Sequence, residues 1–254
     1  MKSLLGIDLP FYSYGILMGI AFIIAVFLFK YNSRNSSLPC PPLIDILLTI
    51  SIFGVLGARI NYILLFPQYY KTLRDCLAIH EGGLVYYGGM ILAIIALFIY
   101  CKIKKYSFLM VADYFVPSLA IGHALGRIGC LINDCCYGTT TNLIKIYHLK
   151  TDSIGVFRHP TQLYEIIYLI ILAVIFTYIL KTGWQEKDSK RGLVASLYII
   201  CYSILRFLNE FLRADSRGGF FTYLNLSPAQ LTSIVLFICS ILFIIIKTKS
   251  IKRG

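Results

Sequence analysis

Two arginines lie in stretches of the chain that are otherwise apolar. Arg127 closes the segment 122–126, and Arg206 closes the apolar run 198–205. An ionised side chain at membrane depth costs at least ~2.5–3.5 kcal/mol on insertion scales, so it normally faces a partner or a water-filled cavity. Guanidinium groups bind phosphate with paired hydrogen bonds, and phospholipid is the phosphate most available in a membrane. The two arginines therefore predict a site that handles phospholipid.

A stripe of polar residues surrounds the second arginine. Tyr202, Arg206, Glu210 and Arg213 follow one another at spacings of four, four and three, which places them along one face of a helix. A carboxylate between two arginines can serve purely to fix helix packing. From this stripe alone, a structural ion-pair ladder and a ligand site both remain open. Arg127 favours the ligand site, because two arginines from separate segments exceed the acids available for simple pairing.

The segment 126–138 combines three glycines, an arginine and three thiols. Non-helical backbone at membrane depth survives only when it is buried in protein or lines a cavity. Cys130, Cys135 and Cys136, with His123 from the preceding helix, raise the idea of a metal site. Adjacent cysteines are awkward joint ligands, however, and no CxxC pair is present, so we expect no metal. A Cys130–Cys135 or Cys130–Cys136 disulfide is the alternative in an oxidising compartment.

Two further polar segments interrupt the apolar pattern. In 158–165 the central proline and threonine are typical of a helix start, and Gln162 shares a face with Glu165. A helix cap with an interfacial tyrosine explains most of this segment, but not a carboxylate inside an apolar run. The paired glycines of 82–89 favour either close helix packing or a broken helix whose amides face a ligand.

The elements that carry these residues are membrane helices. The chain is 58% hydrophobic and only 14% charged, which is typical of an integral membrane protein. We predict one all-α, polytopic membrane domain with seven transmembrane helices around a lipid-accessible cavity, each long enough for a ~30 Å hydrocarbon core. The predicted spans are 12–29, 43–65, 83–101, 108–126, 161–180, 192–212 and 229–246. Segment 127–160 is expected to form a loop region on the outer face.

Positive charge favours one orientation of these spans. The net charge is +12, and compact basic clusters at 102–105 and 247–253 lie beside span ends. Basic loops stay on the cytoplasmic side, so we expect the N-terminus outside and the C-terminus inside. In a membrane protein this surplus charge is expected to hold anionic lipid headgroups rather than nucleic acid.

Together these motifs resemble the bacterial prolipoprotein diacylglyceryl transferase family along nearly the whole chain. The motifs that carry the resemblance are Tyr14-Gly15, the double Gly-Gly block at 82–89, Asp113 and Pro117, Gly126-Arg127-x-Gly129 with Gly138, the block 159–165, Arg206-x-x-x-Glu210-x-x-Arg213, and Ser227-x-x-Gln230.

The resemblance implies a multi-pass enzyme of the bacterial inner membrane whose site opens outward. Such enzymes move the diacylglyceryl group of phosphatidylglycerol to the thiol of a lipobox cysteine in a prolipoprotein. A thioether forms and glycerol 1-phosphate leaves. Arg127 and Arg206 would hold the phosphate and stabilise charge on the leaving group. No cofactor or metal is implied.

The motifs and the resemblance together give the expected site residues. Those expected in catalysis are Arg127, Arg206, Tyr87, Glu210 and His159. Those expected to bind substrate are Tyr14, Asp113, Gly129, Cys130, Cys135, Gly138, Gln162, Tyr202 and Arg213.

The chain departs from the usual family pattern at three positions. Tyr87 stands where the family commonly has a histidine, Cys130 where it has asparagine, and Cys135 where it has glutamate. We therefore expect Tyr87, His123 or His159 to handle the proton of the incoming thiol. Two alternatives remain: a paralogue that delivers a phospholipid-derived group to another acceptor, and a non-catalytic protein that binds or transports phospholipid.

Overall fold

The structure is a computed structural model that describes residues 13–34, 36, 39–69, 83, 85–142, 156–187, 190–214 and 226–251. Its α-helices are α1 (Ser13–Ser33), α2 (Leu43–Leu65), α4 (Tyr86–Ile103), α5 (Phe108–Ile132), α6 (Thr161–Lys181), α7 (Leu193–Glu210) and α8 (Pro228–Ile251). Two short 3-10 helices are η1 (Pro67–Tyr69) and η3 (Trp184–Glu186). Within these ranges β-structure is limited to two isolated bridges, so the expected all-α class is confirmed.

The helices are those of a multi-pass membrane protein. Six are long and apolar enough to cross a membrane, and α4 adds a shorter apolar stretch, Gly88–Ile103. One predicted boundary is wrong, because α5 continues to Ile132 instead of ending near residue 126. Arg127 and Cys130 therefore lie on a helix and not in the predicted loop 127–160. Continued helix keeps every backbone group paired at membrane depth, which a loop there does not.

Apolar side chains cover the outside of the helices as well as the core. Phe27, Leu64 and Tyr178 are each at least 70% exposed, although they are large and apolar. A helix that is apolar on all sides is typical of a membrane span, because lipid tails solvate its outer face. The buried polar side chains are thus the exceptional ones, and they locate the interior chemistry.

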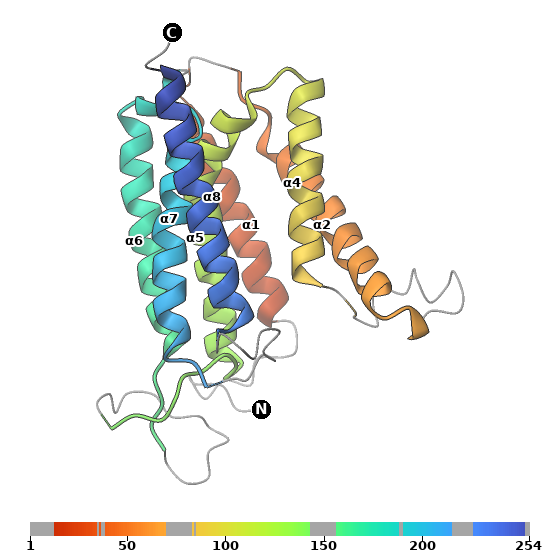
Figure 1. Ribbon diagram of the computed structural model, residues 1–254, viewed down its shortest axis with the longest axis vertical. Coiled ribbons are helices and arrows are strands. Elements are labelled where there is room, and N and C mark those ends of the chain that lie inside the picture. The colour runs from red at the N-terminus through yellow and green to blue at the C-terminus, as the bar shows by residue number, and fades with distance from the viewer. Residues whose placement is uncertain are drawn as a thin grey trace. The chain divides into compact units, whose positions relative to one another are not determined.

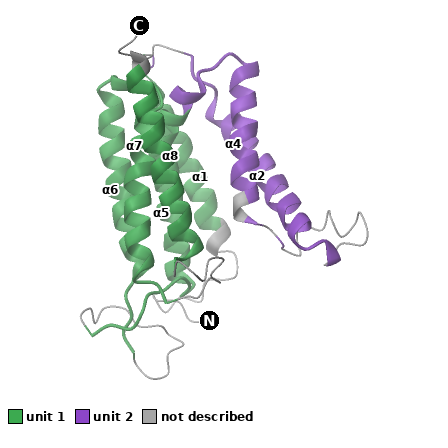
Figure 2. Ribbon diagram, in the orientation of Figure 1, with its two compact units in different colours: residues 1–35, 112–254 green, residues 36–111 purple. Residues whose placement is uncertain are grey.

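The chain divides into two compact units, residues 36–111 and residues 1–35 with 112–254 (Figure 2). In the first unit α2 packs on α4 through glycines. A Cβ on Gly57 would lie 2.5 Å from the carbonyl oxygen of Gly88, and one on Gly89 would lie 2.6 Å from that of Gly54. Only glycine permits so close an approach of two backbones. The glycine block 82–89 thus has the helix-packing role that the sequence left open, at least at Gly88 and Gly89.

The same unit holds a third intramembrane arginine. Arg59 of α2 is 5% exposed, and its Nη1 donates a hydrogen bond to the carbonyl oxygen of Gly83 at 3.3 Å. Gly83 adopts φ +73°, a left-handed conformation that glycine reaches without strain. The turn before α4 thereby presents its carbonyl to the guanidinium, which satisfies part of a charge that would be costly alone.

The second unit is a bundle of α1, α5, α6, α7 and α8 (Figure 1). Helix α7 packs against both α6 and α8, and α1 contacts α6. The hydroxyl of Ser118 donates to the carbonyl oxygen of Ala25 at 2.9 Å, which joins α5 to α1. Helices α5 and α7 end, and α6 and α8 begin, at the end of the bundle where α1 starts (Figure 1). Polar segments between these helices therefore meet at one end.

Candidate active site

Glu165 is the centre of a buried polar network between α5 and α6. Its side chain is 1% exposed, and its Oε2 lies 3.1 Å from Nε of Arg127. Its Oε1 lies 3.5 Å from Nε2 of His123, one helical turn before Arg127. Asn209 of α7 donates to Oε2 at 3.5 Å and to the carbonyl oxygen of Thr161 at 3.3 Å. One carboxylate thus ties three helices together.

The sequence pointed to Glu165 as a carboxylate inside an apolar run, but not as the hub of the site. Spacing places Glu165 four residues into α6 without showing which helix it faces. The signal that could have found it is the pairing requirement: an arginine at membrane depth needs an acid, and Glu165 is an acid at the same depth.

Glu210 forms a second centre at the end of α7. Nη1 of Arg206 lies 2.6 Å from its Oε2, and Nε of Arg213 lies 3.8 Å from the same oxygen. Ser227, just before α8, donates its hydroxyl to Oε1 at 2.8 Å. Gln230 accepts a hydrogen bond from the Ser227 amide at 2.9 Å, which fixes the start of α8. The predicted ladder of Arg206, Glu210 and Arg213 is confirmed as a set of contacts.

His123 and two tyrosine rings, from α6 and α7, form a group beside the Glu165 centre. The ring of Tyr202 lies 5.5 Å from that of His123 and 6.4 Å from that of Tyr168, centroid to centroid. Arg127 lies one helical turn after His123 on α5, and Arg206 lies one turn after Tyr202 on α7. The two arginines thus face a common region, although each has its own carboxylate partner. Tyr202, predicted as a substrate-binding residue, lies within that region.

The residues that carry the three clustered cysteines, 130–136, are called the thiol segment, and their last two residues contact the start of α6. The buried Thr161 hydroxyl donates to the Cys136 carbonyl oxygen at 2.8 Å, and Gln162 donates to that of Cys135 at 2.7 Å. The Sγ atoms of Cys130, Cys135 and Cys136 all lie within 4.8 Å of one another. Gln162, expected to bind substrate, therefore has a structural contact with the thiol segment.

Cys135 and Cys136, which follow α5, differ in the direction in which their surroundings shift the thiol pKa. A hydrogen bond from the Cys130 thiol holds the pKa of Cys136 well below its usual range, and Arg213 and Arg127 act in the same direction against burial. Burial raises the pKa of the Cys135 thiol. Low-pKa thiols beside arginines are the nucleophilic and metal-binding ones.

Gly138 and His159 belong to a small backbone junction at the same end. The amide of Gly138 donates to the carbonyl oxygen of His159 at 2.9 Å, and Gly138 forms an antiparallel bridge with Arg213. His159 Nδ1 lies 3.2 Å from the hydroxyl of Tyr164. Within the part of the chain that the structure describes, no contact joins His159 to Glu165 or Glu210. Gly138 thus joins the loop to α7, while His159 lies beside the site and not in its centre.

Asp113 lies apart from these centres. Its Oδ2 accepts a hydrogen bond from the amide of Gly192 at 2.7 Å, and its Oδ1 accepts one from that of Ala195 at 2.8 Å. The residue is fully buried at the N-terminal end of α7, roughly 20 Å along α5 from Arg127 at 1.5 Å per residue. Its contacts are those of a helix cap. A substrate-binding role for Asp113 stays a prediction.

Three other predicted residues are not placed in the network. The side chains of Tyr14 and Tyr87 lie outside the described residues, although their backbones lie in α1 and α4. Gly129 is buried within α5, two residues beyond Arg127. The roles of these three residues stay predictions.

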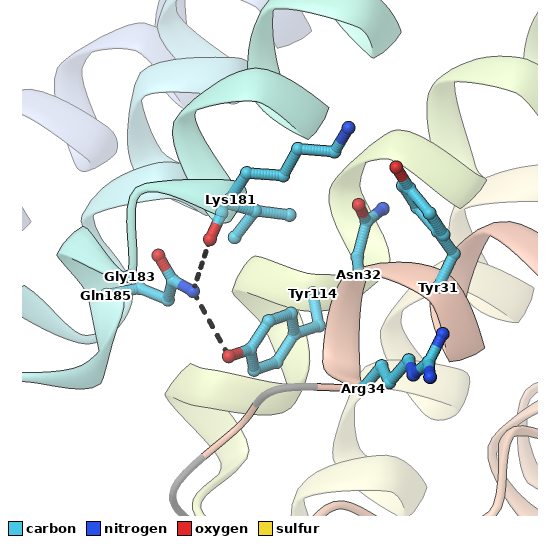
Figure 3. Close-up of a pocket in the computed structure, with 8 residues that line it drawn as sticks. Tyr31, Asn32, Arg34, Tyr114, Lys181, Gly183 and Gln185 are labelled. Carbon is cyan, nitrogen blue, oxygen red and sulfur yellow. Dashed lines mark hydrogen bonds between the residues drawn. The ribbon is translucent and has the colours of Figure 1, made fainter.

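A separate cavity of about 510 Å³ lies near the C-terminal ends of α1 and α6 (Figure 3). Arg34 and Lys181 are among its lining residues, and Asn32 is 8% exposed with neither amide atom hydrogen-bonded among the described residues. Gln185 donates to the hydroxyl of Tyr114 at 3.1 Å on its wall. None of the residues predicted from the sequence lines it. The cavity lies ~30 Å along α6 from Thr161, at the opposite end of that helix. The predicted residues gather at the Glu165–Glu210 region instead, and this region is therefore the candidate active site.

The fold and this region define a multi-pass membrane protein with a buried, arginine-rich polar interior. A sequence model described as prolipoprotein diacylglyceryl transferase matches residues 2–246. The chain is 35% identical over 256 residues to the phosphatidylglycerol–prolipoprotein diacylglyceryl transferase of Finegoldia magna, covering 99% of this chain and 96% of the relative. It is 33% identical over 250 residues to a Clostridium perfringens enzyme of that name (95% and 93% covered), and 34% identical over 239 residues to that of Thermotoga maritima (91% and 78%). The chain belongs to the prolipoprotein diacylglyceryl transferase family.

Proposed function

We propose that this protein transfers the diacylglyceryl group of phosphatidylglycerol to the thiol of a lipobox cysteine in prolipoproteins. The observation that carries the proposal is a pair of intramembrane arginines that face one region. Arg127 and Arg206 each keep a carboxylate partner, Glu165 and Glu210, and their helices meet where the His123 and Tyr202 rings lie 5.5 Å apart. Guanidiniums at membrane depth normally face a partner or a wet cavity, and they bind phosphate oxygens in pairs. A phosphodiester therefore suits this region.

The arginines retain hydrogen-bonding capacity for such a phosphate. The ion pair of Arg127 uses Nε, and that of Arg206 uses Nη1. The remaining N–H groups of each guanidinium form no ion pair among the described residues. A guanidinium has five N–H donors in a planar fork, so it can keep its carboxylate and still bind phosphate oxygens. As the phosphate ester leaves, the same donors stabilise its growing charge.

The reaction is a substitution at carbon. The acceptor thiolate attacks the glycerol carbon of the diacylglyceryl group, a carbon–sulfur bond forms, and the carbon–oxygen bond to phosphate breaks with its electron pair. Glycerol 1-phosphate departs, and the proton of the thiol must go to a base. His123 suits this role because Glu165 contacts its Nε2 and its side chain remains 30% exposed. A carboxylate that holds an imidazole in place fixes the direction from which the ring can accept a proton.

The base assignment has a direct test. His123→Ala is expected to lower turnover by ~10²–10⁴-fold, the usual contribution of a positioned general base. His159→Ala and Tyr87→Phe serve as comparisons, since these residues were the other candidates. An unchanged turnover in His123→Ala, with a large loss in either comparison variant, moves the base to that residue.

The site is proposed to open on the outer side of the cytoplasmic membrane. The site lies at the end of the bundle where α1 starts, so an N-terminus outside also puts the site outside (Figure 1). Lys30, Lys181 and Lys249 lie in the last turns of α1, α6 and α8, at the opposite end. Basic residues at helix ends favour the cytoplasmic side.

Complementation of a strain depleted of its own transferase tests the function, with lipoprotein mass as the readout. The wild-type chain is expected to restore the diacylglyceryl mass increment, while Arg127→Ala and Arg206→Ala insert normally but do not. Phospholipid consumption without modified lipobox peptide would support the paralogue with another acceptor. Binding of phosphatidylglycerol without release of glycerol 1-phosphate would support the non-catalytic alternative.

A further inference from the structure

The thiols of Cys130, Cys135 and Cys136 converge on one point, which the adjacent positions of two of them in the sequence did not lead us to expect. Consecutive residues in extended backbone point to opposite sides, so Cys135 and Cys136 are expected to diverge. In the structure Cys136 has φ +66° and Asp134 has φ +49°. Positive φ is uncommon for residues other than glycine, and it redirects the side chain. The sulfur atoms of Cys130, Cys135 and Cys136 are thereby brought within 4.8 Å of one another.

Buried contacts hold this conformation in place. The carbonyl groups of Cys135 and Cys136 are bonded by Gln162 and Thr161, which are 1% and 0% exposed. The amide of Cys135 donates to the carbonyl oxygen of Cys130 at 3.1 Å, which closes the turn after α5. Unfavourable backbone angles that the surroundings maintain point to a function. Here their visible effect is to converge three sulfur atoms.

We propose that Cys130, Cys135 and Cys136 bind a thiophilic divalent cation, best matched by Zn²⁺, with a fourth coordination position open to the acceptor thiol. This inference rests on the proposed function. Zn–S bonds are about 2.3 Å, so three thiolates on one zinc lie roughly 4 Å apart, within the observed spacing. Three protein ligands and one open position are the pattern of catalytic zinc sites.

The exposure of Cys135 and the positive charge beside the cluster are both consistent with a metal site that has an open coordination position. Cys135 is exposed, while Cys130 and Cys136 are partly buried. Among the described residues no fourth cysteine, histidine or carboxylate joins the cluster. His123, considered as a ligand from the sequence, contacts Glu165 instead. Zinc with three thiolates carries a net negative charge, and Arg213, which is hydrogen-bonded to Cys136, lies beside it.

The metal would activate the acceptor for the reaction proposed above. A thiol that coordinates zinc is deprotonated. Its proton passes to His123 or to water, and its sulfur electron pair then forms the bond to the glycerol carbon while the bond to phosphate breaks. The thioether product carries no charge and is a weaker ligand than a thiolate, so it can leave the metal. Arg127 precedes Cys130 by three residues on α5, so the proposed phosphate ligand and one proposed metal ligand share a face of that helix.

Metal content tests the proposal without reference to activity. The full-length protein, purified in detergent with equimolar zinc and without chelator, is expected to hold one zinc per chain by elemental mass spectrometry. Cys130→Ser, Cys135→Ser and Cys136→Ser are each expected to lower occupancy at least tenfold. Cys239→Ser, an exposed thiol on α8, is the matched control and should retain full occupancy. Size-exclusion profiles establish that each variant is folded.

A cobalt-substituted wild-type protein supplies a measurement that needs no variant. Thiolate-to-cobalt charge-transfer absorption is expected, and adding a lipobox peptide should change it, whereas the same peptide with serine for cysteine should not. A metal-free protein with full transferase activity overturns this inference and leaves the proposed function intact, as does a native Cys130–Cys135 or Cys130–Cys136 disulfide. Bound zinc with no transfer to any lipobox peptide overturns the proposed function instead.

Discussion

Arg127 of α5 and Glu165 of α6 form an ion pair 3.1 Å long, in which the carboxylate is almost completely buried. His123 and Asn209 share the same carboxylate. The pair therefore does two things at once: it compensates a charge at membrane depth, and it positions an imidazole one turn away. A structural ladder would need only the first of these. The shared imidazole is the group that we propose as the general base, and the ion pair holds it in place.

Glu165→Gln removes both roles at once. Loss of the carboxylate leaves Arg127 buried without its partner, which costs about 3–5 kcal/mol in comparable buried pairs. We expect a lower melting temperature in detergent and a fall in turnover of at least ~100-fold, since His123 loses its orienting group.

The double variant Arg127→Gln with Glu165→Gln is the control for charge. Removing both charges should restore much of the stability, because no unpaired charge remains, while activity stays lost. Stability losses that simply add would show that the two side chains act independently, contrary to the observed ion pair.

Arg206→Lys tests whether the geometry of the guanidinium matters beyond its charge. Lysine keeps the attraction to Glu210 but has no planar fork for bidentate contact with phosphate. We expect near-normal thermal stability and a loss of kcat/KM of about 10–100-fold, since one charge-assisted hydrogen bond is worth ~1.5–3 kcal/mol. Kinetics over a range of phosphatidylglycerol fractions in mixed micelles measures this. Equal activity of the lysine variant would reduce Arg206 to an electrostatic partner of Glu210.

Sequence reasoning located most helices and the arginine stripe, because both depend on local periodicity. Apolar runs fix where spans lie, and spacings of three and four fix which residues share a face. Glu165 was harder to assign, since nothing local tells which neighbouring helix a buried carboxylate contacts. The convergence of Cys135 and Cys136 was beyond reach, because a positive φ at a cysteine is imposed by Thr161 and Gln162 from another helix. Tertiary contacts of this kind leave no periodic trace.

Asp113→Asn distinguishes a helix cap from a substrate-binding residue. Both carboxylate oxygens of Asp113 accept backbone hydrogen bonds at the start of α7, and an amide can reproduce only one of them. We expect a loss of about 0.5–2 kcal/mol in stability, typical of a lost N-cap, with unchanged turnover per folded molecule. Thermal unfolding and kinetics on the same preparation measure the two effects. A large rise in KM for phosphatidylglycerol with intact stability would return Asp113 to the substrate site.

A substitution at Gly138, in the junction between the loop and α7, can be compared with a matched substitution at Gly122 on α5. A Cβ on Gly138 would lie 2.6 Å from the carbonyl oxygen of His159 and 2.7 Å from that of Leu212, so the loop or the end of α7 must move. Overpacking of this kind costs about 1–3 kcal/mol, and it would also shift Arg213, which pairs with Gly138 across the bridge. Gly138→Ala is therefore expected to lower both stability and transfer. Gly122→Ala on α5 meets no atom within 4 Å and removes a flexible residue from a helix, so it should leave transfer unchanged and stability equal or higher. If both variants behaved alike, close packing at Gly138 would not be what joins the thiol segment to α7.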